Sequence, residues 1–154
     1  MSDPLRVVLS IDLEDWNQLV ARQLGEQDWD SPGTAFPRQV DALLQCLSDL
    51  SLKATFFVLG LTAKNYPEVV SRVAGAGHPI ACHGYAHHAV RLQSPPVLRD
   101  DLQRSLDLLG SLTGRRPLGF RAPAFSLSRR DVWAFEVLAD LGFTYDSSLN
   151  DTPR

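Results

Sequence analysis

The sequence predicts an α/β fold in which βα units surround a parallel sheet. Apolar runs of strand length alternate along the chain with segments of helical periodicity, which is typical of this class. Polar residues suited to chemistry follow several of the apolar runs, as they do where parallel strands end at a common crevice. The 154 residues are 44% hydrophobic and 21% charged, so we expect a single domain over residues 1–154.

Five apolar segments have the length and composition of strands. The first is rich in β-branched residues and leads into the acidic cluster at 12–15, and the second is closed by Gly60. The predicted strands are residues 5–11, 54–60, 79–82, 118–121 and 143–146.

Four segments between the strands carry leucine or valine at helical spacing. Pro67 suits the first turn of the second helix, and Ser128 with Asp131 resembles a capping box before the fourth. The predicted helices are residues 39–50, 67–76, 98–112 and 128–142. The polar stretch 23–36 contains turn residues and is predicted to form a surface loop near the strand ends.

Composition excludes several classes of partner. A net charge of -3 with scattered arginines provides no basic stripe, so we expect no nucleic-acid partner. No segment approaches the roughly 20 apolar residues of a membrane span, and the start lacks the pattern of a signal peptide. We therefore expect a cytoplasmic protein in which Cys46 and Cys82 are buried thiols rather than a disulfide.

Two histidines, His83 and His87, follow the third predicted strand in the segment His-Gly-Tyr-Ala-His. They share one face if this segment forms a single helical turn. Two imidazoles and one carboxylate make the ligand set of a catalytic zinc site, whose fourth position stays open for water. Such a pair also occurs in exposed turns, so the zinc prediction depends on a carboxylate from elsewhere. His78 and His88 are predicted to be turn residues rather than ligands.

The acidic cluster after the first predicted strand offers that carboxylate. Asp12 and Glu14 alternate in an extended segment and therefore share a face. One would bind the metal, and the other would take a proton from water activated by it. The alternative is that these acids only solvate a loop or cap a helix.

Arg121 lies between the fourth predicted strand and Pro123. A guanidinium beside a general base would hold it ionised and oriented through a bidentate contact. The alternative is a surface salt bridge of little energetic value. Backbone N–H groups just after the proline could form an oxyanion hole.

Taken in order, these motifs resemble the polysaccharide deacetylase (NodB-homology) family, in particular its branch of peptidoglycan deacetylases and allantoinase-like proteins. Segments 10–16, 83–87 and 121–124 resemble its first three motifs, and 54–60 and 145–148 resemble recurrent segments. The resemblance implies a distorted (β/α) barrel. Because a full barrel takes roughly 250 residues, we expect this catalytic domain to be truncated after about five strands and to lack its C-terminal part.

The resemblance also implies residue roles. Asp12 would be the general base, Arg121 would orient it, and the backbone N–H of Ala124 would hold the oxyanion. His83 and His87 would bind the metal. The usual first motif has two adjacent aspartates, so the carboxylate ligand here is Glu14 or Asp15, and Glu14 is preferred. Ala124 replaces a common aromatic residue, and the late histidine expected as general acid has no counterpart after His88.

The expected function is therefore that of a metal-dependent hydrolase, with zinc as the expected metal, that removes N-acetyl groups from a polysaccharide. The substrate partner would be an N-acetylated glycan, and exposed sheet edges could lead to self-association. Two alternatives remain open. One is an allantoinase-like hydrolysis of a small cyclic amide, and the other is an inactive glycan-binding or partner-binding domain.

Overall fold

The structure, a computed structural model, describes residues 8–149 and contains a five-stranded sheet in the order β1-β2-β3-β4-β5. Every neighbouring pair of strands is parallel, so their carboxyl ends lie along one edge. This confirms the predicted fold class. The strands are β1 (Ser10–Leu13), β2 (Thr55–Val58), β3 (Ile80–Cys82), β4 (Gly119–Phe120) and β5 (Tyr145–Asp146).

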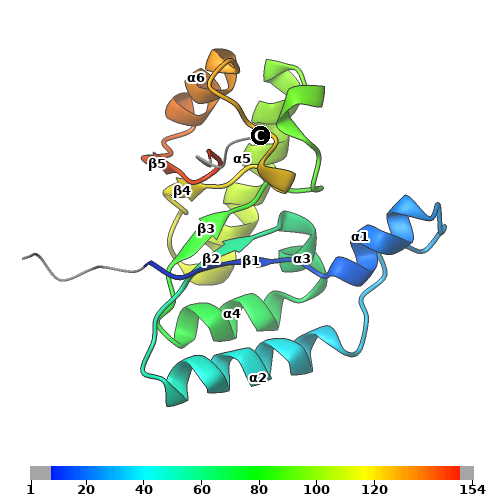
Figure 1. Ribbon diagram of the computed structural model, residues 1–154, viewed down its shortest axis with the longest axis vertical. Helices are drawn as coiled ribbons and strands as arrows, with labels where there is room; N and C mark the ends of the chain where they lie inside the picture. Colours follow the sequence, from blue (N-terminus) through cyan, green and yellow to red (C-terminus); the bar gives the residue numbers. More distant parts are fainter. Residues whose placement is uncertain (1–7, 150–154) are drawn as a thin grey trace, which may run out of the picture.

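Helices connect the strands (Figure 1). Those at four predicted positions are α2 (Phe36–Asp49), α4 (Pro67–Gly75), α5 (Pro95–Thr113) and α6 (Val132–Asp140). The prediction missed α1 (Trp16–Gln23), α3 (Gly60–Asn65) and the 3-10 segments η1 (Val90–Leu92) and η2 (Pro123–Phe125), because short segments carry too few periodic residues. Within residues 8–149, no helix is long and apolar enough to cross a membrane.

Several predicted boundaries were wrong. The strand predicted at 5–11 begins at Ser10 and runs to Leu13, because Leu13 still pairs with Val58 of β2; residues 1–7 lie outside the described residues. Gly60 does not close a strand but begins α3. The helix predicted from residue 128 begins at 132, because the Asp131 carboxylate accepts the Ser128 N–H at 2.8 Å and forms a turn before the helix.

The hydrophobic core lies between one face of the sheet and the helices. Figure 1 shows α2 and α4 running side by side along this layer. The sheet contributes alternate residues to the core, as the period of a strand requires; they include Leu13, Phe56, Val58, Cys82 and Phe120. Cys82 is buried in this core, but Cys46 is exposed on α2, so the expectation of two buried thiols was wrong for Cys46. Both thiols are free, as expected.

The other face of the sheet carries both polar and apolar residues. Asp12 pairs in register with Phe57, and Phe57 with Ala81, so these residues point away from the helix layer. Arg121, directly after β4, places Nη1 2.7 Å from Asp12 Oδ1 in β1. The long arginine side chain therefore reaches across β3 and β2 on this face of the sheet.

Gly60 occupies a position where a side chain does not fit. Its N–H donates to the Gly84 carbonyl at 2.9 Å, which brings the start of α3 against the segment that follows β3. A Cβ atom at this position would lie 2.9 Å from the Tyr85 Cα, closer than real Cβ atoms approach. The absence of a side chain thus lets α3 and the histidine-bearing segment meet.

We expect Gly60→Ala to lower the free energy of unfolding by about 1–3 kcal/mol, because overpacking displaces the backbone at Tyr85. Urea unfolding would measure the change. Gly75→Ala is the matched control, since a Cβ there meets nothing within 4 Å and Gly75 lies in α4. This control should be neutral or stabilise by up to about 1 kcal/mol. Equal losses in both variants would contradict the packing argument.

Candidate metal and catalytic site

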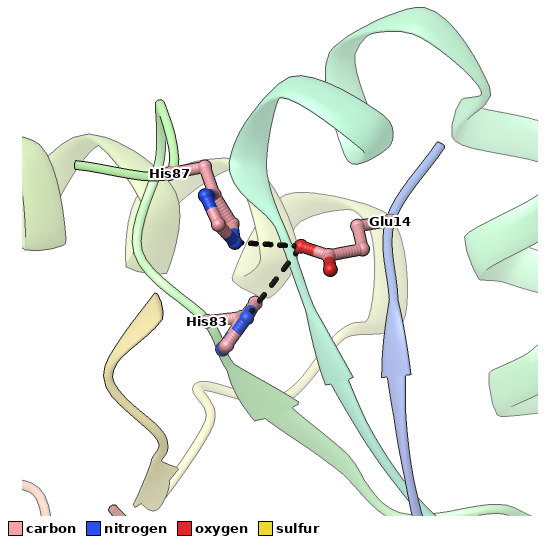
Figure 2. Close-up of side chains that lie close together, drawn as sticks. All are labelled: Glu14, His83 and His87. Atoms are coloured by element: carbon pink, nitrogen blue, oxygen red, sulfur yellow. Dashed lines mark ion pairs between the residues drawn. The ribbon is translucent and has the colours of Figure 1, made fainter. Parts of the chain in front are cut away.

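Glu14, His83 and His87 converge at the carboxyl edge of the sheet (Figure 2). Glu14 Oε2 lies 3.6 Å from His83 Nε2 and 3.0 Å from His87 Nε2. One possible ligand atom from each of the three residues lies within 4.8 Å of those of the other two. This is the spacing at which three side chains can share one cation.

Parallel strands bring these residues together from distant parts of the chain. Glu14 directly follows β1, and His83 directly follows β3. The segment from His83 to His87 is not helical, so the predicted helical turn was wrong. Gly84 and His87 instead adopt positive φ angles of 76° and 55°, and the resulting turn folds the second imidazole back toward the first. The two rings have centroids 5.5 Å apart.

His83 is held so that Nε2 faces Glu14. Its Nδ1 lies 2.8 Å from the Arg121 carbonyl, which can only accept, so Nδ1 carries the proton and Nε2 keeps its lone pair. Burial lowers the pKa of His83 and outweighs the opposing effects of Asp12 and Glu14. A buried neutral imidazole, fixed through its other nitrogen, is the form that binds metals.

Glu14 provides the carboxylate of the cluster. Burial raises its pKa, but the contact with His87 and the charges of both histidines outweigh burial, and the net shift is downward. Oε2 is buried and accepts no well-aligned hydrogen bond, although His87 Nε2 is close. A buried carboxylate oxygen with unused acceptor capacity, facing two imidazoles, fits a divalent cation bound through nitrogen and oxygen.

Asp15 has a different environment. It caps α1 by accepting the Asn17 N–H at 3.1 Å, and its other oxygen accepts the Tyr66 hydroxyl at 2.6 Å. Burial and this bond to Asp15 raise the pKa of Tyr66 to about 12. The Tyr66 hydroxyl also accepts the Gly33 N–H at 2.6 Å. Of the two carboxylates left open by the sequence, the structure therefore places Glu14, and not Asp15, with the histidines.

Asp12 lies beside the cluster and is anchored by Arg121. Its Oδ1 accepts from Arg121 Nη1 at 2.7 Å, and its Oδ2 lies 3.9 Å from His83 Nε2. The predicted bidentate contact is absent from the described hydrogen bonds, because Arg121 Nη2 donates to Ser10 Oγ and Ser147 Oγ instead. Asp12 thus has one oxygen held by the guanidinium and one directed toward the histidines.

Sequence reasoning missed the residues that hold Arg121. Ser10 and Ser147 accept from Nη2 at 2.8 and 2.9 Å, and the guanidinium lies 4.1 Å from the ring centroid of Phe57. Ser10 shares a strand face with Asp12, and Ser147 follows the last strand. Their positions in the sequence could therefore have identified both serines as residues of the site. Nearly complete burial and these contacts exclude the alternative of a surface salt bridge for Arg121.

Ala124 lies in η2 at the margin of this site. It is exposed and adopts the left-handed region with φ 52°, as does Phe125 with φ 48°. The Phe125 ring centroid lies 5.4 Å from the Arg121 guanidinium carbon. An aromatic ring therefore borders the site one residue after Ala124, where the family commonly has an aromatic residue. The preceding segment is fixed by a hydrogen bond from the Ala122 N–H to Ser148 Oγ at 2.8 Å.

The other two histidines lie outside the ligand group. His78 is buried rather than in an exposed turn, and its Nδ1 accepts the Ala54 N–H at 3.3 Å. Burial lowers the pKa of His78, and the Lys53 charge adds to the shift. His88 is exposed.

The profile of the family described as Polysaccharide deacetylase matches residues 29–145. A peptidoglycan deacetylase-like protein of Gibberella zeae is 34% identical over 113 residues, which are 72% of this chain and 32% of that protein. A peptidoglycan-N-acetylglucosamine deacetylase of Bacillus cereus is 32% identical over 109 residues, which are 70% of this chain and 38% of that protein.

Among solved structures, a Mycobacterium smegmatis protein assigned by inference to the polysaccharide deacetylases superposes with a TM-score of 0.78 at 31% identity. The match covers 94% of this chain and 51% of that one. The chain thus spans about a third of the length of the curated relatives and about half of the solved structure. The matched family profile, the sequence identity and the shared fold agree, and the chain belongs to the polysaccharide deacetylase family.

Proposed function

We propose that this chain carries the metal-binding residues of a hydrolase that removes N-acetyl groups from a glycan. The observation that carries the proposal is the cluster of Glu14, His83 and His87 beside the Asp12–Arg121 pair. The names of the relatives, which describe peptidoglycan and N-acetylglucosamine deacetylases, support an N-acetylated glycan as the substrate class. The reaction would add water across the acetamide C–N bond and release acetate and an amine.

The ligand set favours zinc as the resident metal. Two imidazole nitrogens and one carboxylate oxygen form a three-ligand site of the kind found in catalytic zinc centres. When bound, such an ion supplies Lewis-acid chemistry, which polarises a carbonyl oxygen and lowers the pKa of water. The residues that would hold it are Glu14, His83 and His87.

Asp12 is the proposed general base. Its Oδ2 lies 3.9 Å from His83 Nε2 in the histidine cluster, and Arg121 Nη1 donates to Oδ1 at 2.7 Å, which fixes the direction of the carboxylate. A base must lie within hydrogen-bond reach of the proton that it takes, and the 3.9 Å between Asp12 Oδ2 and His83 Nε2 supports this role for a water bound beside the cluster. The backbone N–H of Ala124, in the exposed turn after Pro123, is the proposed donor to the oxyanion.

We expect the purified chain to bind about one zinc per molecule. The His83→Ala, His87→Ala double variant should bind none, since each substitution removes one imidazole ligand. Elemental analysis of folded samples would measure this. His88→Ala is the control, because His88 is a neighbouring exposed histidine outside the cluster. Zinc retained in the double variant would show that the metal binds elsewhere.

We expect Asp12→Asn to reduce acetate release from N-acetylglucosamine oligomers by about 10²- to 10⁴-fold, the usual contribution of a general base. Bound zinc should remain, because Asp12 lies outside the ligand group. Acetate assays and metal analysis on the same preparation separate the two effects. Undiminished acetate release would contradict the assignment of Asp12.

We expect zinc affinity to fall as the pH is lowered, because protons compete with the metal for the ligand atoms. The pKa values of His83 and Glu14 are both lowered, so these two ligands remain unprotonated to a more acidic pH than an ordinary histidine and glutamate would. Competition with a chelator between pH 5 and pH 8 would measure the profile. An affinity that increases toward acid would rule out this ligand set.

A further inference from the structure

The turn that carries the second histidine has an uncommon backbone conformation at the histidine itself. His87 has φ 55°, which is uncommon for a residue with a side chain, whereas Gly84, with φ 76°, adopts this region without steric cost. Such a conformation persists only where the surrounding structure determines it. Because this turn directs His87 Nε2 toward Glu14 at 3.0 Å, the contacts that hold the turn also determine the geometry of the ligand cluster.

Helix α5 supplies acceptors for the N–H groups of this turn. Asp101 Oδ2 accepts the Tyr85 N–H at 2.7 Å, and Asp101 Oδ1 accepts the Ala86 N–H at 3.3 Å. One turn further along α5, the buried Ser105 donates its hydroxyl to the Gly84 carbonyl at 3.1 Å. One carboxylate thus binds two consecutive N–H groups between the proposed ligands His83 and His87.

The carbonyl groups of the same turn bind other elements. The Gly60 N–H, at the start of α3, donates to the Gly84 carbonyl at 2.9 Å, and the Leu61 N–H donates to the Tyr85 carbonyl at 2.8 Å. Arg22 of α1 donates to the Ala86 carbonyl at 2.6 Å. Helices α1 and α3, together with Ser105 of α5, therefore hold the carbonyl groups of the turn, whereas Asp101 accepts both of the N–H groups described above.

We propose that Asp101 is a positioning residue of the metal centre, which holds the backbone at Tyr85 and Ala86 so that His87 faces Glu14 and His83. The inference rests on the proposed metal-dependent function. Asp101 lies outside the ligand group, and its hydrogen bonds go to backbone atoms, so it acts through His87 rather than on the metal or the substrate. Hydrogen bonds from N–H groups to an ionised carboxylate are stronger than neutral ones, which suits a turn with a disfavoured backbone.

The test is Asp101→Asn, which preserves shape but replaces one acceptor oxygen with an NH₂ group that cannot accept. We expect the zinc affinity to fall by about 10-fold or more, as measured by competition with a chelator. The absorption spectrum of the cobalt-substituted protein should change, since it reports ligand geometry independently of stability. Amide hydrogen exchange at Tyr85 and Ala86 should accelerate in the metal-free protein, because one of these N–H groups loses its acceptor.

Asp100→Asn is the matched control. Asp100 precedes Asp101 on the same helix and is exposed. Its substitution by Asn removes the same charge as Asp101→Asn. It should leave zinc affinity, cobalt spectrum and amide exchange unchanged. Asp101→Glu, which keeps two acceptor oxygens, should recover part of the affinity and provides a second variant if Asp101→Asn folds poorly.

The outcomes separate the inference from the function on which it rests. Unchanged affinity and spectrum in folded Asp101→Asn would overturn the positioning role while leaving the proposed metal centre intact. Equal losses in the Asp100 and Asp101 variants would also overturn it, because a general charge effect would then explain both. No zinc binding by the unaltered chain would overturn the metal centre and the positioning role together.

Discussion

The geometry of the site depends on Arg121, which reaches across the face of the sheet opposite the hydrophobic core. Its guanidinium binds Asp12 and Ser10 of β1 and Ser147 after β5, although β1 and β4 are separated by two other strands. Its carbonyl accepts the Nδ1 proton of His83. One residue therefore orients the proposed base through its side chain and a proposed metal ligand through its backbone.

The two faces of the sheet have separate roles. Apolar residues such as Phe56 and Phe120 pack against the helices and stabilise the fold by removing hydrocarbon surface from water. The opposite face contains the carboxylates, the imidazoles and the guanidinium. Buried charged groups are tolerated only when groups of opposite charge or hydrogen-bond partners lie beside them. Glu14 Oε2 lies 3.0 Å from His87 Nε2, and Asp12 Oδ1 lies 2.7 Å from Arg121 Nη1, so each carboxylate has a nitrogen group beside it.

Much of the fold could be predicted because local patterns determine it. The apolar run of β2 and the leucine stripe of α5 each contain enough periodic residues to identify the element. The six residues of α3 do not, and Gly60 was misinterpreted as the end of a strand. Only the packing of Tyr85 against Gly60 shows why a glycine begins this helix.

The sequence by itself determined the candidate residues of the site: alternation along one strand placed Asp12 and Glu14 on a common side, and the spacing of His83 and His87 marked them as a pair. Tertiary structure decided their environments. It separated Glu14 from Asp15, because a helix cap and Tyr66 occupy the latter. It also replaced the expected helical turn with one held by Asp101. These choices depend on contacts between residues far apart in the chain, which local periodicity cannot encode.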